Sequence, residues 1–577
     1  MILGYLFTLA YAILLAGLLW TAFVLRKEIY GKLAEDTTPQ YIALALIVVA
    51  FFVVFSLLHV SPVEQLYFDE SIYQGIALNI LHAGNALWCQ YGTAQFAYCG
   101  ASQIYHDPVE LSFYIAIAFA IFGASVKTAY GLSMLVGAIS VFLVFLLGSS
   151  LFGRRTGIAS AVVFALIPEV MIWSRTQAVP NLIFMMFTVL SFYAYEIYRH
   201  KKSSASLAFF LFALGIAVYT RIEAAILLPL FAVLIIYESF ALNGIRKGIE
   251  KLIGKDSTKN IVVIALFVIL IVPEIYYIAY EGQSLDYGNG YLCGTQTNAT
   301  FSLSNFKCNA STNINFFLGK FASRQYYPAY FSAITTLMAV VGAVLMLLKK
   351  VKKGIPLLLL GLWIILFHAF YDAFYAGSVR FGVDVRFMLV IYPAMAILAG
   401  FGIAHLSADI PDVLGLSGRR RRNAKGSMIE AAIFVVLIAL FAALPFYNAL
   451  GITTIKPQNM PQEAVPLNYI NFIYQNASLV PSNCLVFTFD PDVWAVQNRS
   501  SAQIGFLRAN NGSFSGFADK FSCFVVDIGY WCTTPMFKTD ICKWGLGKNP
   551  TLITGVPAPG GGNFSLYYIS RNSTQAS

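Results

Sequence analysis

The chain alternates long apolar runs with short polar stretches. About 20 consecutive apolar residues form a helix that crosses a bilayer, so we predict a polytopic α-helical membrane protein with about twelve spans. A further apolar run, Val109–Phe122, is too short to cross, and we expect a helix at the membrane interface there. The predicted spans lie near residues 2–25, 40–60, 128–150, 157–174, 181–198, 205–220, 223–240, 260–280, 329–348, 354–372, 387–405 and 428–448.

Lysine and arginine gather in alternate loops between these runs, at Arg26-Lys27, Arg154-Arg155, Arg199–Lys202, Arg246–Lys259, Lys349–Lys353 and Arg419–Arg422. The positive-inside rule places these loops in the cytoplasm. The 577 residues are 58% hydrophobic and 11% charged, which excludes a soluble globular protein. The formal net charge of +10 is therefore a sign of topology, and we expect no nucleic acid partner.

Cysteines and glycosylation sequons support this orientation, because all of them fall on the opposite, extracytoplasmic side. An even number of cysteines confined to an oxidising compartment indicates disulfides, and we expect the local pairs Cys89–Cys99 and Cys293–Cys308. The remaining cysteines are Cys484, Cys523, Cys532 and Cys542. N-x-S/T sequons begin at Asn298, Asn309, Asn476, Asn498, Asn511, Asn563 and Asn572.

The domain organisation follows from the larger polar segments. We expect a transmembrane domain over residues 1–448, with extracytoplasmic loops at 61–127 and 281–328, and an extracytoplasmic domain over 449–577. In that domain, helical spacing over Pro466–Gln475 and the buried runs Cys484–Phe489 and Cys523–Trp531 predict an α/β or α+β fold. The first span has no basic leader and is longer than the apolar part of a signal peptide, so we expect it to be retained.

One acidic pair stands where the chain leaves the second span. Asp69 and Glu70 begin a helical pattern that Ile72, Ile76 and Ile80 continue at four-residue spacing. Asp69 can simply cap this helix, since acids favour the positive N-terminal end. A carboxylate at the membrane surface can also act as a general base on a hydroxyl, and a capped carboxylate is also held in place for that role.

Further charged residues lie within or beside the spans, toward their extracytoplasmic ends. A structural ion pair or a snorkelling side chain explains any one of them. As a set they indicate a polar cavity beneath the 61–127 loop, because charges at membrane depth are costly outside protein-lined spaces. They are Glu169, Arg175, Arg221, Glu223, Glu274, His368, Asp372, Arg380 and Arg386.

These features resemble the GT-C glycosyltransferases that use polyprenyl-phosphate sugars, such as protein O-mannosyltransferases and lipid A aminoarabinose transferases. The pattern D-E-x-x-Y, formed by Asp69, Glu70 and Tyr73, is similar to their first extracytoplasmic loop. Further similar segments follow in the family's order at His106–Gly123, Leu146–Asn181, Ala217–Leu230 and Val385–Ile403.

The chain also departs from the family's pattern. Asn181 stands where many relatives have Asp, which bears on any mechanism that needs a second acid there. Arg221 stands where they often have Lys, and Asp107–Glu110 replaces a Pro-Pro pair. The first span is an addition at the N-terminus.

The resemblance implies inverting transfer of a hexose, such as mannose, from a polyprenyl- or dolichyl-phosphate donor to a protein or glycan hydroxyl. Asp69 would be the base and Glu70 would orient it. Tyr73, His106, Arg175, Arg221, Glu223, Arg380 and Arg386 would bind the donor or its phosphate, and Glu169, Glu274, His368 and Asp372 would line the cavity. The resemblance implies no required cofactor or metal. An archaeal cell membrane is the first expectation for the compartment and an ER membrane the second.

Other function classes find less support in the sequence. A transporter of lipids or small solutes is the main alternative, but neither an inverted repeat nor a pair of broken helices is evident. An oligosaccharyltransferase would carry a W-W-D-Y-G motif, which is absent. A non-catalytic membrane protein would leave the acidic pair without a use. No P-loop, H-E-x-x-H or C-x-x-C occurs, the six histidines are scattered, and Asp490-Pro491-Asp492 suggests a turn.

Overall fold

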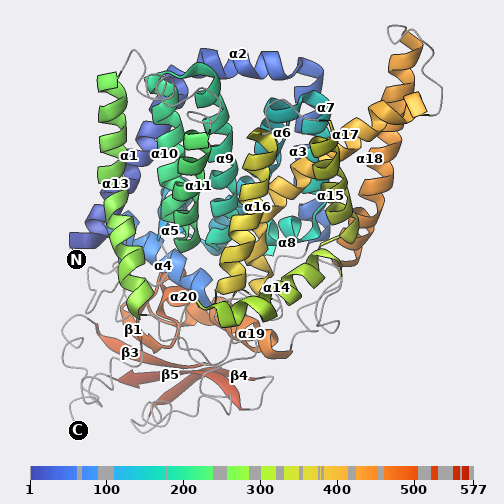
Figure 1. The fold of residues 1–577 in the computed structure, drawn as a ribbon. Helices are drawn as coiled ribbons and strands as arrows, with labels where there is room; N and C mark the ends of the chain where they lie inside the picture. The colour runs from blue at the N-terminus through green and yellow to red at the C-terminus, as the bar shows by residue number, and fades with distance from the viewer. Residues whose placement is uncertain are drawn as a thin grey trace.

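A computed structural model shows a helical bundle with a small sheet domain at one end (Figure 1). The structure describes residues 2–60, 68–88, 109–176, 179–237, 257–284, 301–319, 331–349, 355–374, 377, 383–413, 424–452, 461–503, 521–529, 550–558 and 562–570. Within these residues the first half of the bundle comprises α1 (Ile2–Val24), α2 (Arg26–Asp36), α3 (Pro39–His59), α4 (Phe68–Ala83), α5 (Glu110–Phe122), α6 (Val126–Phe152), α7 (Arg154–Ala165), α8 (Pro168–Thr176), α9 (Pro180–Lys201) and α10 (Ser204–Thr220). The second half comprises η2 (Ile222–Ile226), α11 (Leu227–Ile236), α13 (Ser257–Ser284), α14 (Leu303–Phe317), α15 (Ala333–Leu348), α16 (Ile355–Ala373), η6 (Val383–Ile391), α17 (Tyr392–Val413) and α18 (Ala424–Ile452).

The prediction of a polytopic helical membrane protein is confirmed. Among the described residues, 8 helices are long and apolar enough to span a membrane, or 9 if the bent pair α7–α8 is counted as one span. Three more predicted spans coincide with shorter apolar helices, α10, η2–α11 and α15. The count of twelve therefore remains a prediction.

The bundle departs from the predicted pattern at several places. The expected span over 157–174 is bent by 62° between α7 and α8, at Pro168, which has no amide hydrogen to continue the helical bonding. The segments of α2 and α14 were not predicted to be helical. Both helices lie along a surface of the bundle (Figure 1). Their polar residues obscure the apolar periodicity from which a helix is predicted.

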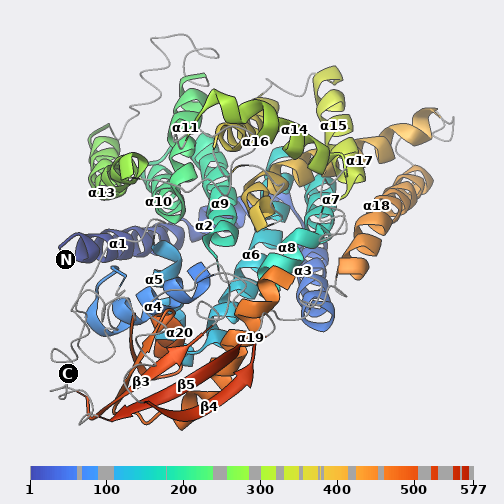
Figure 2. The ribbon, with the colours of Figure 1, turned by 90° about the horizontal axis from the view of Figure 1, so that it is seen from below.

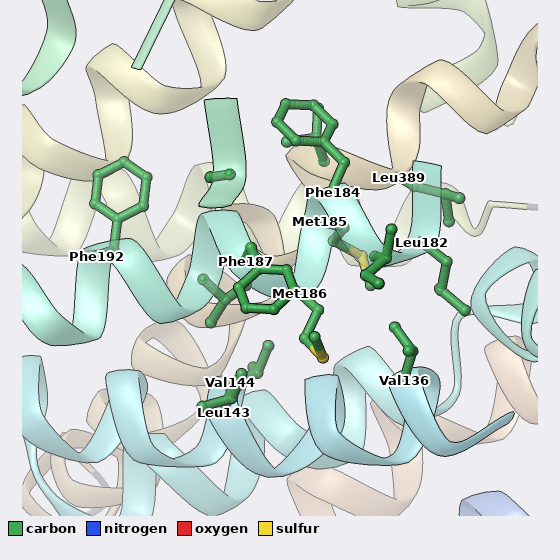
Figure 3. Close-up of a cluster of buried hydrophobic side chains, with 14 of the residues drawn as sticks. Val136, Leu143, Val144, Leu182, Phe184, Met185, Met186, Phe187, Phe192 and Leu389 are labelled. Atoms are coloured by element: carbon green, nitrogen blue, oxygen red, sulfur yellow. The ribbon is translucent and has the colours of Figure 1, made fainter. Parts of the chain in front are cut away.

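Helix α9 lies in the interior of the bundle with α17, since their membrane-length windows are 94% and 100% buried. The side chains of α9 show how this interior is packed. The apolar ones interlock with those of α6 and with Leu389 of η6 (Figure 3). The rings of Phe192 and Trp363 stack with centroids 4.1 Å apart, which ties α9 to α16. In contrast, α18 is only 6% buried over its window, as expected for a helix that faces lipid.

Helices α15 and α17 cross closely at Gly342. A Cβ atom there would lie 1.9 Å from the carbonyl oxygen of Leu398. Only glycine allows this approach, and small residues are the usual means by which membrane helices pack without a hydrophobic driving force.

The C-terminal sheet domain is a mixed α/β unit, which confirms the predicted small domain with strands at its two buried runs. Its sheet has the order β2-β1-β3-β5-β4, with β1 parallel to β2 and β3, and β5 antiparallel to β3 and β4. The elements are α19 (Pro461–Asn476), β1 (Cys484–Thr488), α20 (Pro491–Val496), β2 (Ser500–Gln503), β3 (Cys523–Ile528), β4 (Thr551–Pro557) and β5 (Asn563–Ser570).

A disulfide joins Cys484 and Cys523, which are register partners at the start of β1 and β3. Cys308 is also disulfide-bonded, and its expected partner Cys293 lies outside the described residues. The same is true of Cys89, Cys99, Cys532 and Cys542, and of the sequons at Asn298, Asn511 and Asn572.

Asp527 is a buried carboxylate inside this domain. One of its oxygens, Oδ2, accepts hydrogen bonds from Thr488 Oγ1 and Trp494 Nε1, each at 2.9 Å, and from the hydroxyl of Tyr469. Burial nevertheless dominates and raises the pKa of Asp527 from 3.8 to about 6. The folded domain therefore binds the proton of Asp527 more tightly than the unfolded chain does.

This shift predicts a pH-dependent stability. Because the pKa is higher in the folded state, the stabilisation is complete below about pH 4 and is lost as the pH rises through about 6. The loss corresponds to about 3 kcal/mol, at 1.36 kcal/mol per pKa unit. We expect wild type and Asp527→Asn to differ in the pH dependence of their thermal unfolding between pH 4 and 7, with the wild type losing more stability. Parallel profiles would contradict the shift.

Candidate functional site

The acidic pair begins α4, where the helix dipole favours negative charge. The two carboxylates have different surroundings. Glu70 is fully buried and accepts a hydrogen bond from the hydroxyl of Tyr130 on α6, whereas Asp69 is partly exposed. Glu70 is thus fixed to the bundle, whereas part of the Asp69 side chain is exposed to solvent. Tyr73, one turn along α4, is fully buried in the core.

Arginines from two parts of the chain meet at one aromatic ring. The guanidinium carbon of Arg221 lies 5.5 Å from the centroid of Phe387, and that of Arg386 lies 5.3 Å from it. Arg221 also binds Glu223 through Nε and Nη2, each 2.9 Å from Oε1, and Tyr371 donates to the same oxygen at 3.3 Å. Two guanidinium groups thus lie at one ring, and a guanidinium can make two parallel hydrogen bonds to a phosphate.

These residues come from η2, α16 and η6, which the structure brings together. Arg221 ends α10 in an extended conformation, so the chain turns there before η2 begins. Phe387 and Arg386 lie on η6, a 3₁₀ helix that leads into α17. The predicted set of Arg221, Glu223 and Arg386 is therefore a spatial cluster.

Glu169 belongs to a different contact. It starts α8 after the bend, is fully buried, and accepts hydrogen bonds from Trp173 Nε1 at 3.1 Å and from the hydroxyl of Tyr392 on α17. This carboxylate fastens the bent helix to α17. Arg175 lies later on α8 and is partly exposed.

Glu274 lies in a third group, on α13. It is close to Tyr219 of α10 and to Glu110 of α5. Glu110 in turn accepts a hydrogen bond from Tyr11 on α1. The hydrogen bond from Tyr11 to Glu110 thus joins α1 to α5, with the expected cavity residue Glu274 nearby, and Glu110 is a buried acid that sequence reasoning missed.

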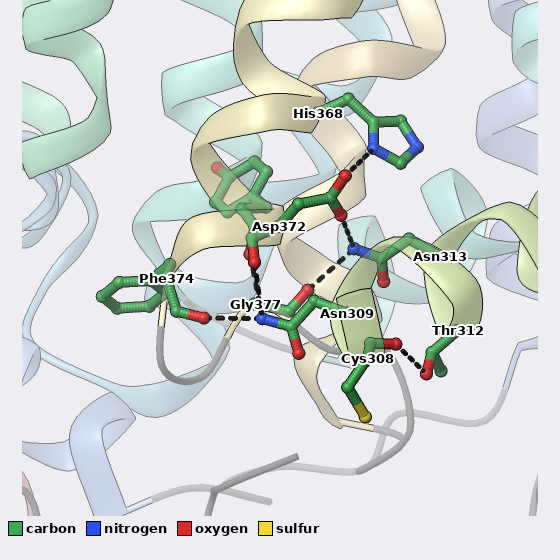
Figure 4. A network of polar contacts seen from close by, with 9 residues as sticks. Cys308, Asn309, Thr312, Asn313, His368, Asp372, Phe374 and Gly377 are labelled. Carbon is green, nitrogen blue, oxygen red and sulfur yellow. Dashed lines mark hydrogen bonds and ion pairs between the residues drawn. The ribbon is translucent and has the colours of Figure 1, made fainter. Parts of the chain in front are cut away.

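His368 and Asp372 form the fourth group, as their four-residue spacing predicts. His368 Nδ1 lies 3.0 Å from Asp372 Oδ2, and Asn313 Nδ2 of α14 donates to the other carboxylate oxygen at 2.9 Å (Figure 4). Asn313 also donates to the carbonyl of Gly377 at 3.0 Å. Through Asn313, helix α14 therefore holds the C-terminal end of α16. The residue that it contacts there, Asp372, directly follows Tyr371.

Asn309 of the same helix has contacts that argue against its predicted glycosylation. It is fully buried, and its Nδ2 donates to the carbonyls of Tyr371, Asp372 and Phe374 at 3.3, 3.1 and 2.7 Å (Figure 4). Nδ2, the atom that would carry a glycan, is thus hydrogen-bonded to carbonyls at the C-terminal end of α16. The sequon Asn309-Ala310-Ser311 is a structural element, whereas Asn498 and Asn563 have exposed side chains.

The prediction that Asp490-Pro491-Asp492 forms a turn is wrong. Pro491 begins the short helix α20, and Asp492 lies against α4. Its Oδ2 accepts a hydrogen bond from Trp88 Nε1 at 3.0 Å. No local pattern signals a contact between residues so far apart. Gly75, a glycine inside a helix, is the one local feature that indicates that another segment approaches α4 closely.

His106 and Arg380 lie outside the described residues. Within the part of the chain that the structure describes, no group of three or more His, Cys, Asp or Glu side chains could hold a metal ion.

Comparisons with known proteins agree with this architecture. Residues 106–277 match the family model for dolichyl-phosphate-mannose-protein mannosyltransferase. No curated protein sequence matches the chain. The structure is similar to that of ArnT from Cupriavidus metallidurans bound to undecaprenyl phosphate, at 13% identity and a TM-score of 0.52, over 92% of this chain and 98% of that one.

ArnT in its apo state gives a TM-score of 0.51 at 13% identity, over 93% of this chain and 98% of ArnT. The archaeal oligosaccharyltransferase AglB from Archaeoglobus fulgidus gives 0.49 at 13% identity, over 92% of this chain and 74% of AglB. The likeness to ArnT extends over nearly the whole of both chains and shows a shared fold.

The contacts of Asn309 generate a prediction about modification and stability. In protein from a glycosylating host, we expect mass spectrometry to find no glycan on peptides that contain Asn309. We also expect Asn309→Ala to lower stability by about 1–3 kcal/mol, because buried carbonyls at the end of α16 lose their donor. Asn563→Ala, at an exposed sequon, is the control and should change stability little. A glycan on Asn309 of folded protein would refute this assignment.

Proposed function

We propose that this chain is a membrane glycosyltransferase of the GT-C superfamily, and that it transfers a hexose from a polyprenyl- or dolichyl-phosphate donor to a hydroxyl of a protein or glycan. The observation that carries the proposal is the pair at the start of α4, in which Glu70 is fixed and Asp69 is accessible. A base must reach the acceptor proton, and a neighbouring group must hold the base in place.

In this reaction Asp69 takes the proton of the acceptor hydroxyl while the acceptor oxygen attacks C1 of the sugar. The bond between C1 and the phosphate oxygen breaks, and the lipid phosphate leaves from the opposite face. The configuration at C1 is therefore inverted. Glu70, held by Tyr130, keeps the first turn of α4 in position.

The leaving phosphate gains negative charge, which cations must stabilise. Arg221 and Arg386, gathered at Phe387, are suited to this, since a guanidinium can make two parallel hydrogen bonds to phosphate. We assign Arg175, with Arg380 and His106 beyond the described residues, to the same role. The undecaprenyl phosphate bound by ArnT supports a polyprenyl-phosphate donor, and the family match supports mannose as the first sugar to test.

The proposed setting is a cell membrane with the sheet domain on its extracytoplasmic side, archaeal as the first choice and ER as the second. The lipid tail of the donor stays in the bilayer, which explains why the enzyme is a helical bundle. The acceptor approaches from the aqueous side, where the sheet domain lies.

The role of Asp69 is tested by transfer of label from polyprenyl-phosphate hexoses to a membrane acceptor extract. We expect Asp69→Asn to fold normally and to lower kcat by about 10²- to 10⁴-fold, because the amide accepts no proton. The control is Asp409→Asn, which removes a carboxylate paired with Lys349 at 2.6 Å, at the far end of α17 from Tyr392. It should retain activity. Normal transfer by Asp69→Asn would exclude Asp69 as the base.

The arginine pair gives a second test. We expect Arg386→Lys to lower kcat/KM for the donor by about 10- to 100-fold, since lysine keeps the charge but loses the planar double contact. Competition by the free lipid phosphate should weaken in the same variant. Unchanged inhibition by the lipid phosphate would separate Arg386 from phosphate binding.

A further inference from the structure

The sheet domain reaches the bundle through α20, a short helix shared by two cores. Val493 and Trp494 pack in the core of the sheet domain, whereas Ala495 and Val496 belong to the core of the bundle. All four side chains are at least 94% buried. In Figures 1 and 2, α20 lies between the sheet and α4, the helix that begins with Asp69 and Glu70.

The contact between α20 and α4 is centred on Asp492. A Cβ atom on Gly75 would lie 1.7 Å from Asp492 Oδ1 and 2.4 Å from its Cγ, so the carboxylate packs directly on the backbone of α4. The other oxygen accepts the hydrogen bond from Trp88 Nε1 at 3.0 Å. Asp492 is 3% exposed and Trp88 7%, so solvent does not compete for this bond.

Trp88 follows α4 and is itself tied back to that helix. Asn79 Nδ2 of α4 donates to the carbonyl of Leu87 at 2.7 Å, and Asn85 Oδ1 accepts from the amide of Leu87 at 3.1 Å. Asp492 therefore contacts the middle of α4 and, through Trp88, its C-terminal end. Tyr130 holds the other end at Glu70.

Gly75 is six residues from Asp69, about 9 Å along a helix axis at 1.5 Å per residue. A helix is stiff over this distance, so a displacement at Gly75 moves the first turn. Transfer requires the base within hydrogen-bond reach of the acceptor, and a misplacement of about 1 Å can lower the rate by about 10²-fold.

We propose that Asp492 is a positioning residue for glycosyl transfer: by packing on Gly75 and holding Trp88, it fixes the helix that carries Asp69. This inference rests on the proposed function. It assigns the sheet domain a part in the reaction that does not require contact with the acceptor.

The experiment combines kinetics with hydrogen exchange on the full-length chain. We expect Trp88→Phe and Asp492→Ala to lower kcat by about 10- to 100-fold with the donor KM changed less than about twofold. Amide exchange over residues 69–83 should become about tenfold faster. Asp492→Asn keeps one acceptor oxygen and the side-chain volume, and because burial raises the pKa of Asp492, the neutral amide suits the site. It should restore most of kcat.

Trp494→Phe is the matched control. It removes an indole–carboxylate hydrogen bond of 2.9 Å, as Trp88→Phe does, but the bond lies inside the sheet domain. We expect faster exchange in β3 and a kcat within about twofold of wild type. If Trp494→Phe lowers kcat as much as Trp88→Phe, domain stability alone explains the loss and the proposal is overturned.

Gly75→Ala separates positioning from helix stability. Alanine favours a helix more than glycine does, yet its Cβ would displace Asp492. A lower kcat supports the proposal, and an unchanged kcat overturns it. If the wild type transfers no sugar from any donor, the proposed function fails. The claim that Asp492 fixes α4 is still tested by amide exchange over residues 69–83. Unchanged exchange in Asp492→Ala overturns that claim.

Discussion

A carboxylate buried among apolar helices costs several kcal/mol unless hydrogen-bond donors or an opposite charge meet it. For three buried acids of this bundle, a donor comes from another helix. Tyr130 of α6 meets Glu70, Tyr392 of α17 meets Glu169, and Asn313 of α14 meets Asp372. Each of these three acids therefore fixes one pair of elements, and together the pairs hold α4, α8 and α16 against their neighbours.

The same constraint distinguishes the site from its support. Glu70, Glu169 and Glu223 are all at least 97% buried, and each accepts a hydrogen bond from another side chain. Asp69 is partly exposed, so it can exchange contacts with water for contacts with a substrate. Solvent exposure is therefore the observed difference between Asp69 and the acids that fasten helices to one another.

The sequence predicted the features that local pattern controls. The four-residue spacing after Asp69 gave α4, and the apolar runs starting at Cys484 and Cys523 gave β1 and β3. It also placed His368 and Asp372 on one helical face. The partners of these residues were not predicted, because Tyr130 is 60 positions from Glu70 and Asp492 is 404 positions from Trp88. Asn309 shows the same limit, since its sequon gives no sign of the hydrogen bonds that it makes to the end of α16.

Backbone irregularity points to the same region as the charges. Within a bilayer, non-α backbone is tolerated where protein buries it or where it lines a polar space. Among the described segments, the bend before α8 precedes Glu169, η2 begins beside Arg221, and η6 contains Arg386. A straight helix would direct such side chains along its own face, whereas a break lets the chain turn a guanidinium toward a neighbouring element. The breaks are thus the means by which three separate parts of the chain bring charged groups to one end of an apolar bundle.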